Sequence, residues 1–148
     1  MVWSAHVTVA TIVERSGQFL VVQEQAGQEY PVINQPAGHL EAGESLLDAA
    51  VRETLEETRW LVQIDALVGV YMYTPPPRPD LTFVRFCFAA TPLEAFEERT
   101  LDTGIIDAFW LTAENILNHP QLRSPMVAQC LKDYLQGQRH PLSLLTAL

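Results

Sequence analysis

The sequence predicts an α/β chain of the α+β type, in which a mixed β-sheet lies between helices in an α/β/α sandwich. Several segments rich in β-branched and aromatic residues are typical of strands. They flank one amphipathic helix near the middle of the chain, and two further helical segments follow near the C-terminus. Because a sheet buries its apolar faces against helices, this order of elements favours a layered sandwich.

The first strands are indicated by their composition. Residues 6–14 are rich in Val, Thr and Ile and predict a strand, and an Arg-Ser-Gly turn leads into a returning strand at residues 18–23. A polar loop follows at residues 24–30. Residues 32–37 predict a short strand, which Pro36 restricts to an edge or a strand end because proline cannot donate to the ladder.

The central helix is predicted at residues 45–58. Ser45, with Asp48 three residues later, forms a capping-box start. Apolar and small side chains recur at helical spacing and form one stripe for packing. They are Leu47, Ala50, Val51, Thr54, Leu55 and Thr58.

The segment after this helix predicts a long hairpin. Residues 60–74 form an apolar run typical of one strand, which twists or bulges near Gly69. The proline-rich residues 75–80 cannot join a sheet ladder and predict an exposed connector. Residues 81–90 then alternate well enough to be the partner strand, and residues 91–104 predict an acidic loop with a short helical turn.

The C-terminal part predicts one more strand and two helices. Residues 105–111 are the last strand. Thr112 is a plausible cap for a short helix to about Asn118, and Ser124 starts a helix that runs to about Gly137.

Size, charge and composition exclude several classes of protein. At 148 residues the chain most simply forms one domain, residues 1–148. The net charge of −9 argues against broad nucleic-acid binding, which needs a basic footprint. The chain has neither an apolar stretch long enough to span a membrane nor an export signal, so we expect a cytoplasmic protein without membrane contacts. Cys87 and Cys130 are expected to be buried, reduced thiols.

Three carboxylates lie on the helix face opposite the apolar stripe. Glu53, Glu56 and Glu57 stand at i, i+3 and i+4 and point toward one volume of space. Like charges at this spacing destabilise a helix unless a cation lies between them, and Arg52 can brace Glu56 from four residues before it. Hard oxygen ligands suit Mg²⁺ or Mn²⁺. The spacing therefore indicates a divalent-metal site, with a solvated acidic face as the alternative that it leaves open.

At this point the pattern resembles a known family. Gly38, Glu44 and the run Arg-Glu-Thr-Leu-Glu-Glu at residues 52–57 fall in register with the signature of the Nudix hydrolases. The resemblance implies the Nudix fold and metal-dependent hydrolysis of phosphoanhydride bonds. One position departs, because Arg59 stands where the family usually has glycine. That glycine ends the helix in a left-handed conformation, which costs other residues about 1–2 kcal/mol.

The resemblance and the residue chemistry together assign catalytic roles to this signature, whose residues Gly38, Glu44 and 52–57 are called the acidic box below. Glu56 and Glu57 are the strongest metal-ligand candidates, and Glu53 is a third ligand or the base that takes the proton from water. Gly38 can add a backbone carbonyl to the metal because no side chain obstructs it. Arg52 is predicted to be a catalytic residue as well. Glu44 is predicted to support the metal ligands without binding the metal itself. The residue that acts as the base varies in the family. Three acidic residues of the predicted loop are therefore further candidates for the base, and the alternative is that they are only solvated: Glu94, Glu97 and Glu98.

Four further residues are predicted to bind the substrate. Arg85 and Arg123 can each grip two phosphate oxygens with their planar guanidinium groups, although each can equally form a structural salt bridge. His39 can touch a phosphate or be a simple surface imidazole. Tyr73, two residues after Tyr71 on one strand face, can stack on an aromatic ring or pack in the core.

A second, broader resemblance narrows the substrates. Segments 6–10, 35–42, 122–125 and 137–139 look like one bacterial branch of the Nudix hydrolases. Members of that branch act as phosphatases on thiamine pyrophosphate, on its hydroxymethylpyrimidine pyrophosphate precursor, and on nucleoside di- and triphosphates. The resemblance implies such small substrates with Mg²⁺ or Mn²⁺. The alternatives are a nucleoside-diphosphate-sugar or dinucleotide pyrophosphohydrolase and a non-catalytic nucleotide-binding module. Monomer and homodimer both stay open.

Overall fold

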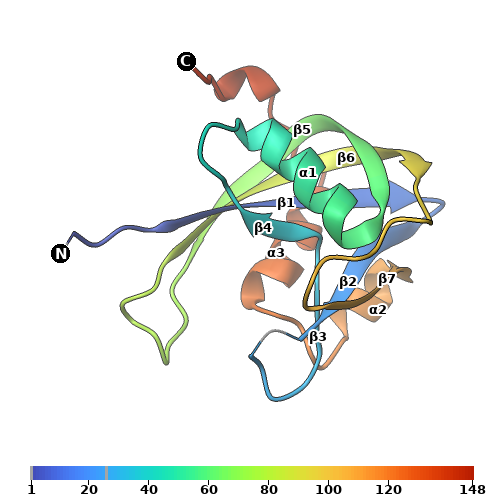
Figure 1. Cartoon of the computed structure of the whole chain (residues 1–148), viewed down its shortest axis with the longest axis horizontal. Coiled ribbons are helices and arrows are strands. Elements are labelled where there is room, and N and C mark those ends of the chain that lie inside the picture. Colours follow the sequence, from blue (N-terminus) through green and yellow to red (C-terminus); the bar gives the residue numbers. More distant parts are fainter. Residues whose placement is uncertain (1, 26) are drawn as a thin grey trace.

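A seven-stranded mixed sheet forms the middle of the molecule (Figure 1). The computed structural model describes residues 2–25 and 27–148. The strands are β1 (His6–Arg15), β2 (Gln18–Glu24), β3 (Val32–Asn34), β4 (Ala37–His39), β5 (Trp60–Tyr73), β6 (Phe83–Ala95) and β7 (Ile105–Thr112). The helices are α1 (Leu46–Thr58), α2 (Ala113–Leu117), α3 (Pro125–Leu135) and the 3₁₀ helix η1 (Leu142–Leu144). Within the described residues, no helix is long and apolar enough to cross a membrane.

The long central strand β1 organises the sheet. The strand order is β3-β2-β1-β6-β5, with β4 also paired to β1 and β7 also paired to β2. β1 and β6 run parallel, whereas the other pairs are antiparallel. The β5–β6 ribbon shifts its register between Leu67 and Gly69, which confirms the predicted irregularity near Gly69.

Helices cover both faces of this sheet, which confirms the predicted sandwich. Successive strand residues point to opposite faces. On one face, Ala49 and Ala50 of α1 pack against Val9 and Phe88. On the other face, α2 and α3 cover Ala10 and its neighbours through four buried side chains (Figure 1). These are Ile116, Val127, Cys130 and Leu131. Both cysteines are buried free thiols, as expected.

Two predicted segments differ from the observed structure. Residues 32–37 form two strands, β3 and β4, because Pro36 has no N–H and the chain changes partner there, from β2 to β1. The carbonyl of Pro36 still accepts a hydrogen bond from the Thr11 N–H at 3.1 Å. Residues 91–95 were predicted as loop but extend β6, because the long strand β5 offers them a ladder that continues to the pair Trp60↔Ala95.

The caps of α1 fix the position of the acidic box. Ser45 Oγ accepts a hydrogen bond from the Asp48 N–H at 3.1 Å, which confirms the predicted start. At the other end Arg59 is left-handed, with φ 68°, and its N–H donates to the Leu55 carbonyl at 2.9 Å. Its guanidinium donates to the Glu97 carbonyl at 3.1 Å. The backbone at the end of the helix therefore has the left-handed conformation that a glycine usually adopts there. Arg59 adopts it although its Cβ makes this conformation unfavourable.

We expect Arg59→Gly to stabilise the protein by about 1 kcal/mol, because glycine adopts this conformation without the Cβ penalty. For a chain of this size, a thermal melt should show a rise of about 2–4 °C. Arg59→Ala is the matched control, since it removes the contact to Glu97 but keeps the strained Cβ, and it should give no rise. A lower melting temperature for the glycine variant would show that the Glu97 contact outweighs the strain.

Candidate active site

The acidic box begins where β4 passes against α1. Gly38 lies so close to the helix that a Cβ built on it would overlap the carboxylate of Glu53. A glycine at this position is therefore what lets the Glu53 carboxylate lie directly against β4, because any Cβ would displace it. Whether the Gly38 carbonyl binds a metal, as predicted, stays a prediction.

Three carboxylates converge beside this contact. Glu53, Glu56 and Asp102 each place one ligand oxygen within 4.8 Å of the others. Asp102 comes from the loop before β7, and its N–H donates to the Glu56 carbonyl at 3.0 Å, which ties the loop to the helix. Two of the three carboxylates were predicted from helical spacing, and Asp102 was not.

The three acidic loop residues that the sequence offers as candidate bases lie away from this cluster. Glu94 is exposed on β6, opposite Leu61. Glu97 and Glu98 lie in the exposed turn after β6, and Glu97 borders a separate pocket beside Arg59. The loop acid that reaches the site is Asp102 instead. Nothing in the local spacing distinguishes it from its neighbours, because only the tertiary fold returns that part of the loop to α1.

Arg52 holds the box together. Its Nη2 lies 2.6 Å from Glu44 Oε1, and its Nη1 lies 2.7 Å from Glu53 Oε1. The predicted contact to Glu56 is present at 3.4 Å but is longer than these two. The hydrogen bond from Arg52 lowers the pKa of Glu44, so Glu44 is a stable anion that fixes the arginine. Arg52 can thereby set the direction of the Glu53 carboxylate.

Glu57 occupies a different environment from Glu53 and Glu56. It is buried, and its Oε1 accepts a hydrogen bond from the Ala37 N–H of β4 at 2.9 Å. Burial raises the pKa of Glu57 to about 9 and also raises the pKa of Glu53. Glu57 is outside the three-oxygen cluster, yet it lines the same cavity of about 320 Å³ as Glu53 and Asp102.

This donor set fits a hard divalent cation. The cavity gathers carboxylate oxygens, which Mg²⁺ and Mn²⁺ prefer. A buried carboxylate such as that of Glu57 is costly to ionise unless a positive charge compensates it, and within the described residues it has no ion-pair partner. A bound cation would supply that compensation.

The metal-free protein should lose stability as the pH rises. Between the usual pKa of 4.5 and the folded pKa of about 9, the folded protein keeps a proton on Glu57 that the unfolded chain has released. Raising the pH across this window therefore favours unfolding. In a chelator, we expect the melting temperature to fall from pH 5 to pH 9, and Glu57→Gln to flatten the decline. Glutamine still accepts the bond from Ala37, so equal slopes for the two proteins would contradict the assignment.

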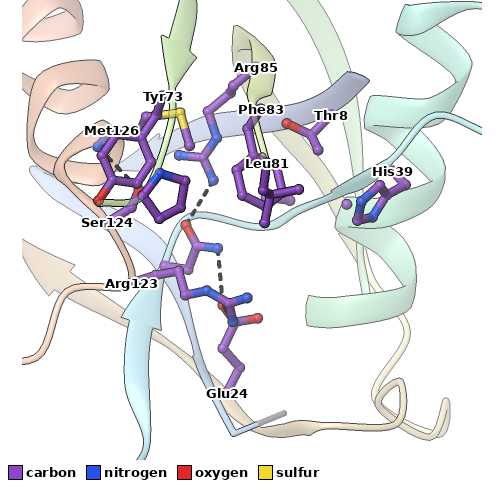
Figure 2. Close-up of a pocket in the computed structure, with 14 residues that line it drawn as sticks. Thr8, Glu24, His39, Tyr73, Leu81, Phe83, Arg85, Arg123, Ser124 and Met126 are labelled. Atoms are coloured by element: carbon purple, nitrogen blue, oxygen red, sulfur yellow. Dashed lines mark hydrogen bonds and ion pairs between the residues drawn. The ribbon is translucent and has the colours of Figure 1, made fainter. Parts of the chain in front are cut away.

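A second pocket, of about 350 Å³, adjoins the acidic cavity (Figure 2). The two cavities share five lining residues. These are Glu24, Ala37, Gly38, His39 and Arg123. The second pocket has largely apolar walls, to which Tyr73 and Phe83 contribute. The fold thus places an acidic cavity and a ring-sized pocket side by side.

All four predicted substrate residues line this second pocket. Arg85 is buried and donates to Gln35 Oε1 at 3.0 Å and to Asn34 Oδ1 at 2.9 Å. Among the described residues it has no carboxylate partner, so the alternative of a structural salt bridge is wrong for Arg85. Arg123 does pair with a carboxylate, Glu24, at 3.3 Å, while its side chain stays 40% exposed between the cavities.

The remaining two residues differ in their surroundings. His39 lies 3.4 Å from the ring of His6, and burial together with that neighbour lowers its pKa. Tyr73 faces the pocket beside Met126 (Figure 2). Tyr71, by contrast, packs against the core and donates from its hydroxyl to Asp133 at 2.8 Å. Stacking therefore stays an option for Tyr73, while Tyr71 has the core role.

The chain is similar to several known proteins. The NUDIX domain model matches residues 4–130. The chain is 40% identical over 140 residues to Phosphatase NudJ of Escherichia coli strain K12, covering 95% of this chain and 90% of that protein. A solved NUDIX hydrolase from Nitrosomonas europaea is 38% identical, with a TM-score of 0.93 and 98% of each chain covered. An ADP-ribose pyrophosphatase from Streptococcus suis, 16% identical with a TM-score of 0.65, covers 88% of this chain and 92% of its own and shares the fold alone.

Proposed function

Because the chain belongs to the Nudix hydrolase family, we propose that it is a Mg²⁺- or Mn²⁺-dependent phosphatase of small pyrophosphorylated metabolites. The observation that carries this proposal is the junction of the two cavities. Carboxylates suited to a divalent cation lie on one side, and a pocket with apolar walls and two arginines lies on the other. The proposed substrates are thiamine pyrophosphate, hydroxymethylpyrimidine pyrophosphate and nucleoside di- and triphosphates.

The chain supplies the groups that such a reaction needs. Glu53, Glu56 and Asp102 would hold the cation, and Arg52 keeps the Glu53 carboxylate in position. When bound, the cation neutralises phosphate charge and lowers the pKa of a bound water. If Glu53 does not bind the cation, its carboxylate, whose pKa is raised by burial, can instead take the proton from the attacking water. Arg123, partly exposed between the cavities, can bind phosphate oxygens with its fork.

The competing activity is cleavage inside a nucleoside-diphosphate sugar or a dinucleotide. The two activities release different products from the same kind of linkage. The name of the relative that is 40% identical, a phosphatase, supports the release of a terminal phosphate. That release needs no second large group on the far side of the broken bond.

A substrate panel with Mg²⁺ tests this proposal. We expect orthophosphate from thiamine pyrophosphate, hydroxymethylpyrimidine pyrophosphate and nucleoside triphosphates, and no release in excess chelator. Nucleoside-diphosphate sugars should react at least about ten times more slowly, because one wrong group in the pocket costs roughly that factor. A nucleoside monophosphate plus a second phosphorylated product would instead assign the pyrophosphohydrolase activity.

A further inference from the structure

The proline-rich connection between β5 and β6 forms part of the wall of the ring-sized pocket. Residues 74–82 project from the sheet as a loop beyond the last ladder pair, Tyr73↔Phe83 (Figure 1). Pro75 and Leu81 of this loop line the pocket together with Tyr73 and Phe83. No residue from 74 to 82 is buried, so no hydrophobic core of its own fixes the loop. Its position is therefore set by hydrogen bonds.

Bonds within the loop make it a stiff unit. The hydroxyl oxygens of Thr74 and Thr82 lie 2.7 Å apart and join its two ends. The Arg78 N–H donates to the Pro75 carbonyl at 2.9 Å, and the Leu81 N–H donates to the Arg78 carbonyl at 3.0 Å. Four of the nine residues from 74 to 82 are prolines, whose rings fix φ. Such a loop moves as one body, so a bond at its tip also positions the residues that line the pocket.

The segment before β1 holds this loop from outside. The Nε1–H of Trp3 donates to the Asp80 carbonyl at 2.7 Å, and the His6 N–H donates to the Thr82 carbonyl at 2.8 Å. Within the described residues, these two hydrogen bonds are the ones that join 74–82 to the rest of the chain. The His6 bond lies at the base of the loop, beside the ladder pair His6↔Phe83. Of the two, only the Trp3 bond reaches the tip.

Loss of the Trp3 bond should free the tip without unfolding the protein. The Trp3 side chain contributes little to the core, because 60% of its surface is exposed. A displaced tip would carry Pro75 and Leu81 away from the pocket, which would lose part of its apolar wall. None of the residues from 74 to 82 lines the acidic cavity. The organic group of a substrate would therefore bind less tightly, while its phosphates would keep their surroundings.

We propose that Trp3 is a positioning residue for the substrate and acts by holding the loop of residues 74–82 against the ring-sized pocket. Trp3 lines neither cavity, so it acts through Pro75 and Leu81 and does not touch the substrate itself. The inference rests on the proposed function, because it places the organic group of the substrate in this pocket and the phosphates over the acidic cavity. Binding of the organic group then depends on Trp3, and phosphate chemistry does not.

Two variants of Trp3 test this inference. Trp3→Phe removes the donor but keeps an aromatic ring, and Trp3→Ala removes both. With Mg²⁺ and either thiamine pyrophosphate or cytidine triphosphate, each change should raise KM by about 3- to 10-fold, as the loss of one hydrogen bond does. The kcat should stay within about twofold, because the bond contributes equally to ground state and transition state. Inorganic tripolyphosphate has the phosphoanhydride but no organic group, so its KM should not change.

Two control variants separate this bond from its surroundings. Val2→Ala shortens the neighbouring side chain, which is 92% exposed and lines neither cavity. Asp80→Ala removes the exposed ion pair with Arg78 but keeps the carbonyl that Trp3 bonds, and exposed ion pairs contribute little. Both controls should keep KM within about twofold of the parent. A thermal melt of every variant should show little change.

Two kinetic results would overturn the inference. One is an unchanged KM for thiamine pyrophosphate and cytidine triphosphate in both Trp3 variants. The other is an equal rise in KM for these compounds and for tripolyphosphate, because the loop would then not act through the organic group.

Binding of thiamine monophosphate and cytidine monophosphate, measured by calorimetry, separates this inference from the proposed function. If no compound releases orthophosphate but Trp3→Phe binds a monophosphate several-fold more weakly than the parent does, the phosphatase function has failed and the role of Trp3 stands. If the parent releases orthophosphate and Trp3→Phe binds the monophosphates as the parent does, the function stands and the role of Trp3 is wrong. If the parent binds neither monophosphate, the pocket does not hold the organic group and the inference fails.

Discussion

Glu53→Gln and Glu56→Gln should each lower kcat on a pyrophosphate substrate by about 10²–10³-fold, as the loss of one catalytic electrostatic group does elsewhere. Both carboxylates contribute an oxygen to the three-oxygen cluster. Glutamine keeps the size of the side chain but removes the charge that would hold the cation. Arg52 retains its 2.6 Å contact to Glu44 in either variant, so the helix should keep its structure. The measurement is kcat at saturating Mg²⁺, together with a thermal melt.

The chain offers a matched control and an internal comparison. Glu94→Gln makes the same chemical change on an exposed part of β6 and should leave kcat within about twofold, as distant surface changes do. Asp102→Asn removes the loop carboxylate and should match the helix variants. Parental turnover in both Glu53→Gln and Glu56→Gln would refute the metal assignment.

Helical periodicity predicted the cluster only in part. Spacing placed Glu53, Glu56 and Glu57 on one face, but neighbouring residues on a helix differ by about 100°, so Glu56 and Glu57 cannot point the same way. Glu56 faces the Asp102 loop, and Glu57 turns toward β4, where the Ala37 N–H binds it. The local sequence pattern predicts which residues share one face of the helix. Which of their carboxylates is buried depends on the neighbouring strand.

The residues that sequence reasoning missed are joined to the site by tertiary contacts alone. Asp102 reaches it through a backbone bond to Glu56, and Glu24 through Asn34 and Arg123. Neither is marked by a spacing or by a flanking motif. Arg85 was named from the sequence, but its hydrogen-bond partners could not be. Its place on a strand was predictable, but its partners are two amides from another strand and the segment after it, which no alternation pattern specifies.

The fold was more predictable than the site because its signals are periodic. The alternation of β1 and β6 sorts Val9 and Phe88 to one face and Ala10 to the other, and α1 and α3 cover those faces. The two misplaced boundaries occur where a long-range partner decides. Pro36 lies where the chain passes from β2 to β1, and β6 continues past residue 90 because β5 pairs with it.

Gly38→Ala should abolish most of the activity while leaving the fold intact. The added methyl group would occupy the space of the Glu53 carboxylate, which is the end of a side chain that can move aside. The melting temperature should therefore change little. The displaced carboxylate would leave its position beside Glu56 and Asp102, and a shift of about 1 Å at a reacting centre can cost about 10²-fold in rate. The measurements are kcat and a thermal melt on the same preparation.

Gly43→Ala, in the turn between β4 and α1, is the complementary control. An added Cβ meets nothing within 4 Å at this position, but the backbone has φ +80°, which a non-glycine residue adopts at a cost of about 1–2 kcal/mol. We expect this variant to lose stability and keep its turnover, the reverse of Gly38→Ala. If Gly38→Ala keeps its turnover, the Glu53 carboxylate tolerates displacement and cannot be a metal ligand or the base. If both variants lose stability but keep their turnover, Gly38 and Gly43 both serve the backbone, and the catalytic role of the β4–α1 contact is wrong.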